Sequence, residues 1–291
     1  MKAIAPNRTP AAPPLPEFGQ SADGLAVARI GDAAYAMTPK REAGYFIGSG
    51  WRLSKPFAEW KRSDFYGHSG GIADEAAFRA FVGEQAEHQA EKAALGRQEF
   101  RAHAITPWGP SQGAVRYAEG VVFHSTSGHG GFHLSTERNA RVHPLLREAY
   151  WYEEDAAWAA VATALPDLFT GLERRQAEET LRHSWPDAWE AIHGRALRSG
   201  ESRVRDAEAF ARDHAEDWVV ISAIYSDHHP GFTEVVATQG GRRDPVAEER
   251  RFLVPSKDYK VGPFGFVIDE TRHAAYDGPS SFIGWRGRAG G

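Results

Sequence analysis

The chain has 291 residues, of which 42% are hydrophobic, a formal net charge of −5 and no cysteine. These values are typical of an ordinary globular protein with a substantial core. They exclude disulfides, thiolate metal sites and a cysteine nucleophile, and a chain-wide basic surface for nucleic acid. The N-terminus lacks the apolar segment of a signal peptide and no apolar run is long enough to span a membrane, so we expect a cytoplasmic protein.

We predict three regions along the chain: a lead at residues 1–24, a small α+β accessory unit at residues 25–98 and a main α+β domain at residues 99–291. The lead is rich in proline between Pro6 and Pro16. Proline removes amide donors and favours extended chain, so we expect the lead to be disordered.

The accessory unit is predicted to begin with β structure. Leu25–Met37 alternates around Gly31-Asp32, a pair that suits the turn of a two-residue hairpin. Gly44–Leu53 is predicted as a third strand, and Phe57–Gly71 as irregular chain. A long helix should follow, because Asp74 is a good N-cap and Gly96 a typical stop.

The main domain is predicted to begin with strands at Ala114–Tyr117, Val121–Ser125 and Phe132–Leu134. Helices should follow at Glu153–Leu165, at Gly171–Arg182, from Pro186 and at Ser202–Glu216. Further strands are expected at Trp218–Tyr225, Phe232–Thr238, Arg251–Val254 and Phe264–Ile268. Strands on both sides of a helical block predict an α+β fold with antiparallel sheet.

A Gly-rich turn carries three histidines in the pattern His-x4-His-x3-His, at His124, His129 and His133. Across a hairpin these imidazoles can converge on a divalent metal, and a carboxylate from the segment Glu153–Asp155 would complete the site. The spacing matches no established metal signature. The alternatives are that the histidines only bond their neighbours, or that His129 alone acts as a general base or anchor.

The same turn offers a second kind of site. Gly128, Gly130 and Gly131 would expose backbone amides to a phosphate or carboxylate, although Gly-rich turns are also common in plain hairpins.

Glu154 and Asp155 are the acidic candidates. Glu154 falls on the apolar stripe of the predicted helix, where burial would raise its pKa and suit it to acid–base catalysis. Acidic residues also favour helix N-termini for purely structural reasons.

Two further residues are candidate binding groups. Trp108 lies in the rigid turn Pro107–Pro110, and His228 lies in the segment Asp227-His228-His229. The latter is similar to the tripeptide of the Asp-His-His phosphoesterases. The chain lacks the earlier Asp-x-Asp that those enzymes require, so we reject that family.

Several motifs together carry a family resemblance: Thr106–Gln112, Gly128–Gly131, Leu134-Ser135, Tyr152–Asp155 and Glu249–Pro255. With them the chain, from about residue 100 to its end, resembles a domain of unknown function that recurs in bacterial phages, plasmids and integrated elements. The resemblance implies a mobile-element context, but no established activity and therefore no catalytic residues to assign. Phe123–Leu134 and Ala156–Leu165 are also faintly similar to plasmid antirestriction proteins of the B type.

We therefore expect an accessory protein of a mobile element that acts by binding a protein partner, as an antagonist of a host restriction or defence system. The alternative is a metal-assisted hydrolase or nuclease, with His129 and His124 or His133 as ligands and Glu154 as base. Nucleic acid is a second class of partner that the sequence allows; a membrane is not expected.

Overall fold

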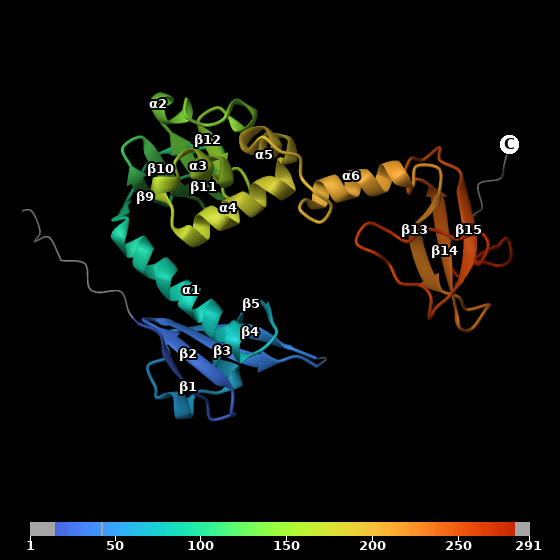
Figure 1. The fold of residues 1–291 in the computed structure, drawn as a ribbon, viewed down its shortest axis with the longest axis horizontal. Helices are drawn as coiled ribbons and strands as arrows, with labels where there is room; N and C mark the ends of the chain where they lie inside the picture. Colours follow the sequence, from blue (N-terminus) through green and yellow to red (C-terminus); the bar gives the residue numbers. More distant parts are fainter. Residues whose placement is uncertain (1–14, 42, 283–291) are drawn as a thin grey trace, which may run out of the picture. The chain divides into compact units, whose positions relative to one another are not determined.

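The structure is a computed structural model that describes residues 15–41 and 43–282. The chain divides into two compact units, one of residues 1–181 with 187–192 and the other of residues 182–186 with 193–291. Within the described residues no helix combines the length and apolar character needed to cross a membrane. The fold class is α+β, as predicted (Figure 1).

The first unit begins with an antiparallel sheet in which neighbouring strands follow chain order. Its strands are β1 (Glu17–Gln20), β2 (Ala26–Ile30), β3 (Ala33–Pro39), β4 (Tyr45–Trp51) and β5 (Gly67–Ile72). The predicted hairpin is confirmed as β2 and β3, and Gly31 in the turn between them has the positive φ of 55° that favours glycine there.

Two predictions for this region differ from the structure. Residues 1–14 of the lead, expected to be disordered, lie outside the described residues. The rest of the lead contains β1, because the prolines end at Pro16 and Glu17–Gln20 then pair with β2. The segment expected to be irregular contains β5, which pairs with β4. The sequence of β5 contains three glycines and no alternation of apolar and polar residues, so it gave no strand pattern. Gly67 is needed there because a side chain would collide with Ser49.

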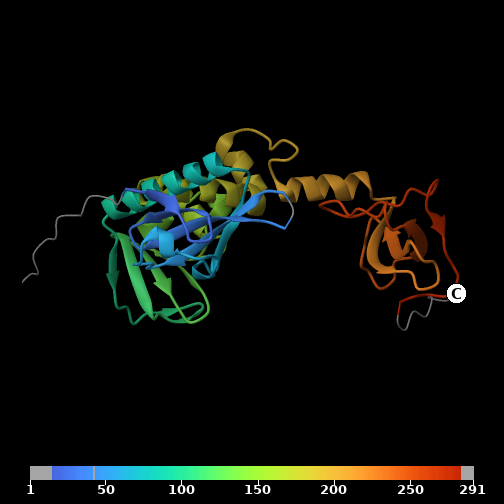
Figure 2. The same ribbon diagram turned by 90° about the horizontal axis from the view of Figure 1, so that it is seen from below.

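Helix α1 (Glu75–Ala94) lies across one face of this sheet (Figures 1 and 2). The Asp74 side chain accepts a hydrogen bond from the amide of Ala77, and Gly96 after the helix has a φ of 61°, so both predicted ends are confirmed. Phe78 and Val82 are buried against the sheet in one apolar cluster.

A second antiparallel sheet of the first unit has the order β12-β11-β10-β9-β6. Its strands are β6 (Gln98–Phe100), β9 (Gly113–Ala118), β10 (Val121–Ser125), β11 (Gly130–Leu134) and β12 (Trp151–Glu153). A two-stranded hairpin, β7 (Ile105–Thr106) with β8 (Gly109–Pro110), precedes β9. The turn predicted at Pro107–Pro110 is therefore present.

A short helix, α2 (Thr136–Asn139), lies between β11 and β12, and a helical block follows the second sheet. The helices of the block are α3 (Trp158–Ala164), α4 (Gly171–Ser184), α5 (Pro186–His193) and, in the second unit, α6 (Arg203–Asp213). Short 3₁₀ turns lie at Phe57–Glu59, Arg62–Asp64, Pro144–Leu146 and Pro166–Leu168.

The predicted helix Glu153–Leu165 begins too early. Glu153 is the last residue of β12, in which Trp151 and the fully buried Tyr152 point to opposite faces. The helix α3 begins only at Trp158.

The second unit contains a sheet of order β13-β14-β15-β16. The strands are β13 (Trp218–Tyr225), β14 (Phe232–Gln239), β15 (Glu249–Pro255) and β16 (Ala274–Ala275). The strand predicted at Phe264–Ile268 is reduced to an isolated bridge between Val219 and Val267, because Gly265, at a φ of 150°, interrupts regular pairing.

The predicted main domain of residues 99–291 is divided between the two units. The predicted boundary near residue 98 lies within the first unit. Hydrogen bonds between α1 and the segment that opens α4 join the two sides of that boundary, His88 to Thr170 and Glu91 to Gly171.

Candidate functional site

The Gly-rich turn connects β10 to β11 and is closed by Thr126. The amides of Gly128 and His129 donate to the Thr126 hydroxyl at 3.4 and 3.2 Å, and that hydroxyl donates to the His129 carbonyl. Gly130 and Gly131 lie within β11 rather than in the turn. The two turn amides therefore already have an acceptor, which leaves little of the predicted anion-binding nest.

The turn brings His129 beside the end of β12. His129 Nδ1 lies 3.5 Å from Glu153 Oε1, and the Glu154 amide donates to the Gly130 carbonyl at 3.0 Å. One nitrogen of His129 and one oxygen each of Glu153 and Glu154 lie within 4.8 Å of one another. Across the described ranges of the chain, no other group of three histidine or acidic side chains meets this criterion.

Only one oxygen of the Glu153 carboxylate accepts a hydrogen bond. Its Oε2 accepts from the Asp155 amide at 2.7 Å, which fixes the carboxylate, whereas Oε1 is buried and has no hydrogen-bond partner. A buried carboxylate oxygen without a donor is costly. One imidazole nitrogen and two carboxylates suit a divalent cation of the zinc or manganese type, and three protein ligands leave positions open for water or substrate.

His124 and His133 do not join this group. Both contact the ring of Trp151, at centroid distances of 5.5 and 4.5 Å, and His124 Nδ1 lies 3.1 Å from Ser111 Oγ. Burial lowers the pKa of His124, with a smaller effect of His133, and burial also lowers the pKa of His133. Of the three predicted metal histidines, only His129 therefore lies with carboxylates.

The paired glycines of the motif are explained by close packing. A side chain at Gly131 would collide with the six-membered ring of Trp108, and one at Gly130 would collide with Phe123 and the Glu154 carboxylate. Trp108 is held by the β7–β8 hairpin, where its amide donates to Thr106 Oγ1 at 3.2 Å.

Some site residues differ from the sequence prediction. Glu154 lies in the turn after β12 rather than on a helical stripe, and Asp155 supports Glu153 through its amide. His228 is exposed in the β13–β14 loop of the second unit. The sequence missed Ser111 and Trp151. A short strand at Trp151–Glu153, with Trp151 and Glu153 on one face and Tyr152 on the other, would have predicted that Trp151 lies beside Glu153.

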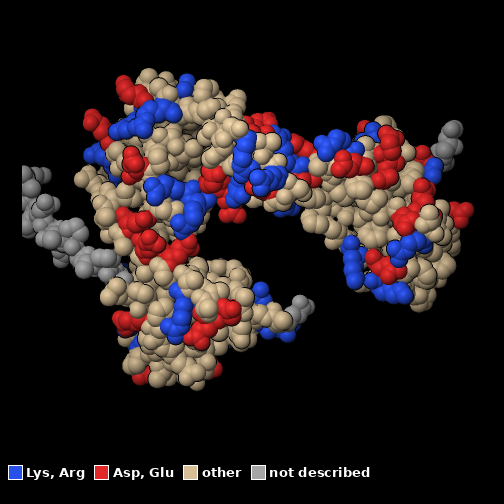
Figure 3. Space-filling view, in the orientation of Figure 1, with Lys and Arg blue, Asp and Glu red and all other residues tan. Residues whose placement is uncertain are grey.

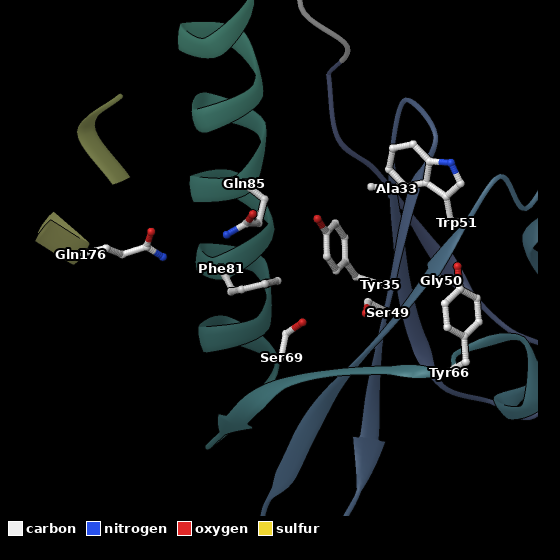
Figure 4. Close-up of a pocket in the computed structure, with 10 residues that line it drawn as sticks. All are labelled: Ala33, Tyr35, Ser49, Gly50, Trp51, Tyr66, Ser69, Phe81, Gln85 and Gln176. Atoms are coloured by element: carbon white, nitrogen blue, oxygen red, sulfur yellow. The ribbon is translucent and has the colours of Figure 1, made fainter. Parts of the chain in front are cut away.

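A separate concave surface lies over the N-terminal sheet (Figure 4). We call it the aromatic groove; its volume is about 500 Å³, and its lining includes Trp51, Tyr66, Tyr35, Phe81, Gln85 and Gln176. Trp51 and Tyr66 are 54% and 77% exposed, which is high for such large rings. None of the lining side chains is charged.

Residues 101–215, less than half of the chain, match the model of a family described as a domain of unknown function (DUF7007). This stretch is a DUF7007 domain. No curated protein and no solved structure shows significant similarity to the chain. The DUF7007 domain contains Trp108, His129, Glu153 and Glu154, so the candidate metal site lies wholly within it. The match ends before β13, whereas the resemblance seen in the sequence was expected to reach the C-terminus.

Proposed function

We propose that the DUF7007 domain binds a divalent cation through His129, Glu153 and Glu154 and uses it to hydrolyse a phosphate-bearing substrate. The observation that carries the proposal is the buried Glu153 Oε1, which has no hydrogen-bond partner and lies beside the His129 ring and the second carboxylate. A cation would satisfy this oxygen and offset the two negative charges.

The proposed chemistry is phosphoester hydrolysis. A cation held by His129, Glu153 and Glu154 would supply Lewis-acid chemistry at a phosphoryl oxygen. Water oxygen forms a bond to phosphorus, the bond to the leaving oxygen breaks, and a water proton passes to the leaving group. This arrangement replaces the ligand set predicted from sequence, because two carboxylates take the places of His124 and His133.

The test is the metal content of protein purified without a His tag, together with titration of the metal-free protein with Mn²⁺ and Zn²⁺. We expect about one bound cation per chain and an affinity at least tenfold lower in His129→Ala and in Glu153→Gln, since ligand loss removes a coordinate bond. Release of nitrophenol from bis(4-nitrophenyl) phosphate should depend on the cation and be lost in Glu153→Gln.

The control is His228→Ala, which removes an exposed imidazole from the other unit and should leave cation affinity unchanged. Equal cation binding by wild type and His129→Ala would rule out this ligand set. Binding without nitrophenol release would restrict the function to cation binding or to another substrate.

The second candidate function is binding of a protein partner, as expected for an accessory of a phage or plasmid that antagonises a host defence protein. The observation that favours it is the exposure of Trp51 and Tyr66 in the aromatic groove (Figure 4). Exposed aromatic residues beside a concave surface are typical of interface hot spots.

For this candidate, the tagged chain is used to capture proteins from a bacterial host with active restriction systems. We expect a defence protein that is retained by wild type and lost by at least tenfold with Trp51→Ala or Tyr66→Ala, because such anchors carry most of the binding energy. Both side chains are exposed, so the unfolding temperature should not change. Retention of the same protein by both variants would exclude the groove as the binding surface.

A further inference from the structure

One face of the DUF7007 sheet carries aromatic side chains next to the candidate metal site. In the strand register His124 lies opposite Gly131, Gly131 opposite Glu153, and His133 opposite Trp151. Directly paired residues of an antiparallel sheet, and residues two apart on a strand, project from the same face. Trp151 and the metal ligand Glu153 are therefore neighbours on that face.

Trp108 completes the aromatic surface from outside the sheet. Its ring lies directly over Gly131, which has no side chain to displace it, and meets Trp151 edge-on at a centroid distance of 5.9 Å. The side chain of Glu153 starts about 5 Å from the position that Trp108 covers, because paired Cβ positions are that far apart. Both indoles are partly exposed. We call Trp108 and Trp151 the indole platform.

The imidazoles around the platform do not supply positive charge. Burial lowers the pKa of both His124 and His133, so they are neutral near pH 7. Figure 3 draws one face of the molecule, on which Lys and Arg atoms are interspersed with Asp and Glu atoms. A cation at His129 and Glu153 would supply positive charge for an anion beside the platform.

We propose that the indole platform stacks an unpaired nucleobase while the phosphate of the same nucleotide binds at the His129–Glu153–Glu154 cation, so that the substrate class is a nucleotide, free or in a single strand. This inference rests on the proposed function, since it assigns the phosphate to that cation. Base–indole stacking needs an accessible aromatic face and tolerates any base. A base in a duplex has both faces covered and does not fit.

The test is fluorescence titration of the full chain with Ca²⁺ or Mn²⁺ present, using AMP, a single-stranded oligothymidylate and a duplex as probes. We expect quenching of tryptophan fluorescence by the unpaired probes, and an affinity about tenfold or more lower in Trp108→Ala, since stacking on one indole contributes that factor. Trp108→Phe keeps an aromatic ring and should bind with intermediate affinity. AMP binding as tightly as the oligonucleotide would identify a free nucleotide as the substrate; much tighter binding of the oligonucleotide would identify a single strand.

Trp185→Phe is the control, because it removes a partly exposed tryptophan that lies between α4 and α5, outside the platform, and should not change nucleotide affinity. Equal affinity of wild type and Trp108→Ala, or preference for the duplex, would overturn the inference. Its failure is separable from failure of the metal site by titrating adenosine, which has no phosphate, in EDTA. Quenching by adenosine that is lost in Trp108→Ala would support base stacking on the platform even if no cation binds. Absence of quenching both by the nucleotides with cation and by adenosine in EDTA would reject the platform.

Discussion

Glu234 is a charged residue at the centre of the β13–β16 sheet, and it is fully buried. Its carboxylate accepts from Arg251 Nη1 at 2.9 Å, from the Ser280 hydroxyl at 2.6 Å and from the Ser281 amide at 2.8 Å. Burial raises the pKa of Glu234, but these donors outweigh burial and lower the pKa overall. The carboxylate thereby fastens the segment after β16 to the middle of the sheet.

We predict that Glu234→Gln lowers the free energy of unfolding of this unit by about 3 kcal/mol, because the buried guanidinium of Arg251 loses its opposite charge. Urea unfolding at pH 7 measures the effect.

Wild type should also lose this stability as the pH falls through the lowered pKa of Glu234, because a depressed carboxyl pKa stabilises the fold only while the group is ionised. Glu248→Gln, in an exposed pair with Arg250, is the control and should change stability by less than about 0.5 kcal/mol. Similar losses in both variants would refute the special role of Glu234.

Helix α1 shows how one element joins the N-terminal sheet to the start of α4 within the first unit. Its N-terminal half buries Phe78 and Val82 against the N-terminal sheet. Its C-terminal half bonds to the segment that opens α4, where Glu91 accepts from the Gly171 amide at 2.5 Å and His88 Nδ1 lies 2.8 Å from Thr170 Oγ1. A single helix therefore has an apolar contact at one end and a polar contact at the other.

We predict that His88 makes this unit less stable in acid. Burial lowers the pKa of His88 below its ordinary value of 6.5, and the charges of Glu173 and Lys92 have smaller effects. The unfolded chain therefore binds a proton at a higher pH than the folded one, and stability falls as the pH drops below about 6.5, until folded His88 is itself protonated.

The comparison is the unfolding temperature of wild type and His88→Asn between pH 7.5 and 5. Asn places an amide near the position of Nδ1 but does not titrate, so the unfolding temperature of His88→Asn should depend less on pH than that of wild type. The corresponding change in the slope of the unfolding free energy is at most about 1.4 kcal/mol per pH unit. His103→Asn, outside this contact, should follow wild type. Parallel curves for wild type and His88→Asn would show that His88 does not contribute.

At the scale of the molecule, the DUF7007 match covers β9–β12 of the second sheet and the helical block, and it leaves out β6, the N-terminal sheet and the β13–β16 sheet. The β13–β16 sheet has its own apolar cluster, which includes Trp218, Val235 and Phe252. The candidate metal site and the indole platform lie inside the match, and the aromatic groove is lined mainly by residues before it. The proposed cation chemistry and the proposed partner binding therefore involve different parts of the chain.

Local signals in the sequence determined most of the elements. Asp74 and Gly96 set the ends of α1, and Gly31 sets the turn between β2 and β3, because each acts on backbone groups within a few residues. Such signals fail where pairing is made by distant chain: β5 and β12 are strands because β4 and β11 lie beside them. The α+β class followed from the order of elements alone.

The sequence singled out His129 and the acidic segment Glu153–Asp155 as candidates, but it grouped His129 with His124 and His133. Only the tertiary structure separated His129 from His124 and His133, because strand register decides which side chains meet. The same register placed Trp151 beside Glu153, and the fold laid Trp108 over Gly131 from a separate hairpin, a contact that no local pattern encodes.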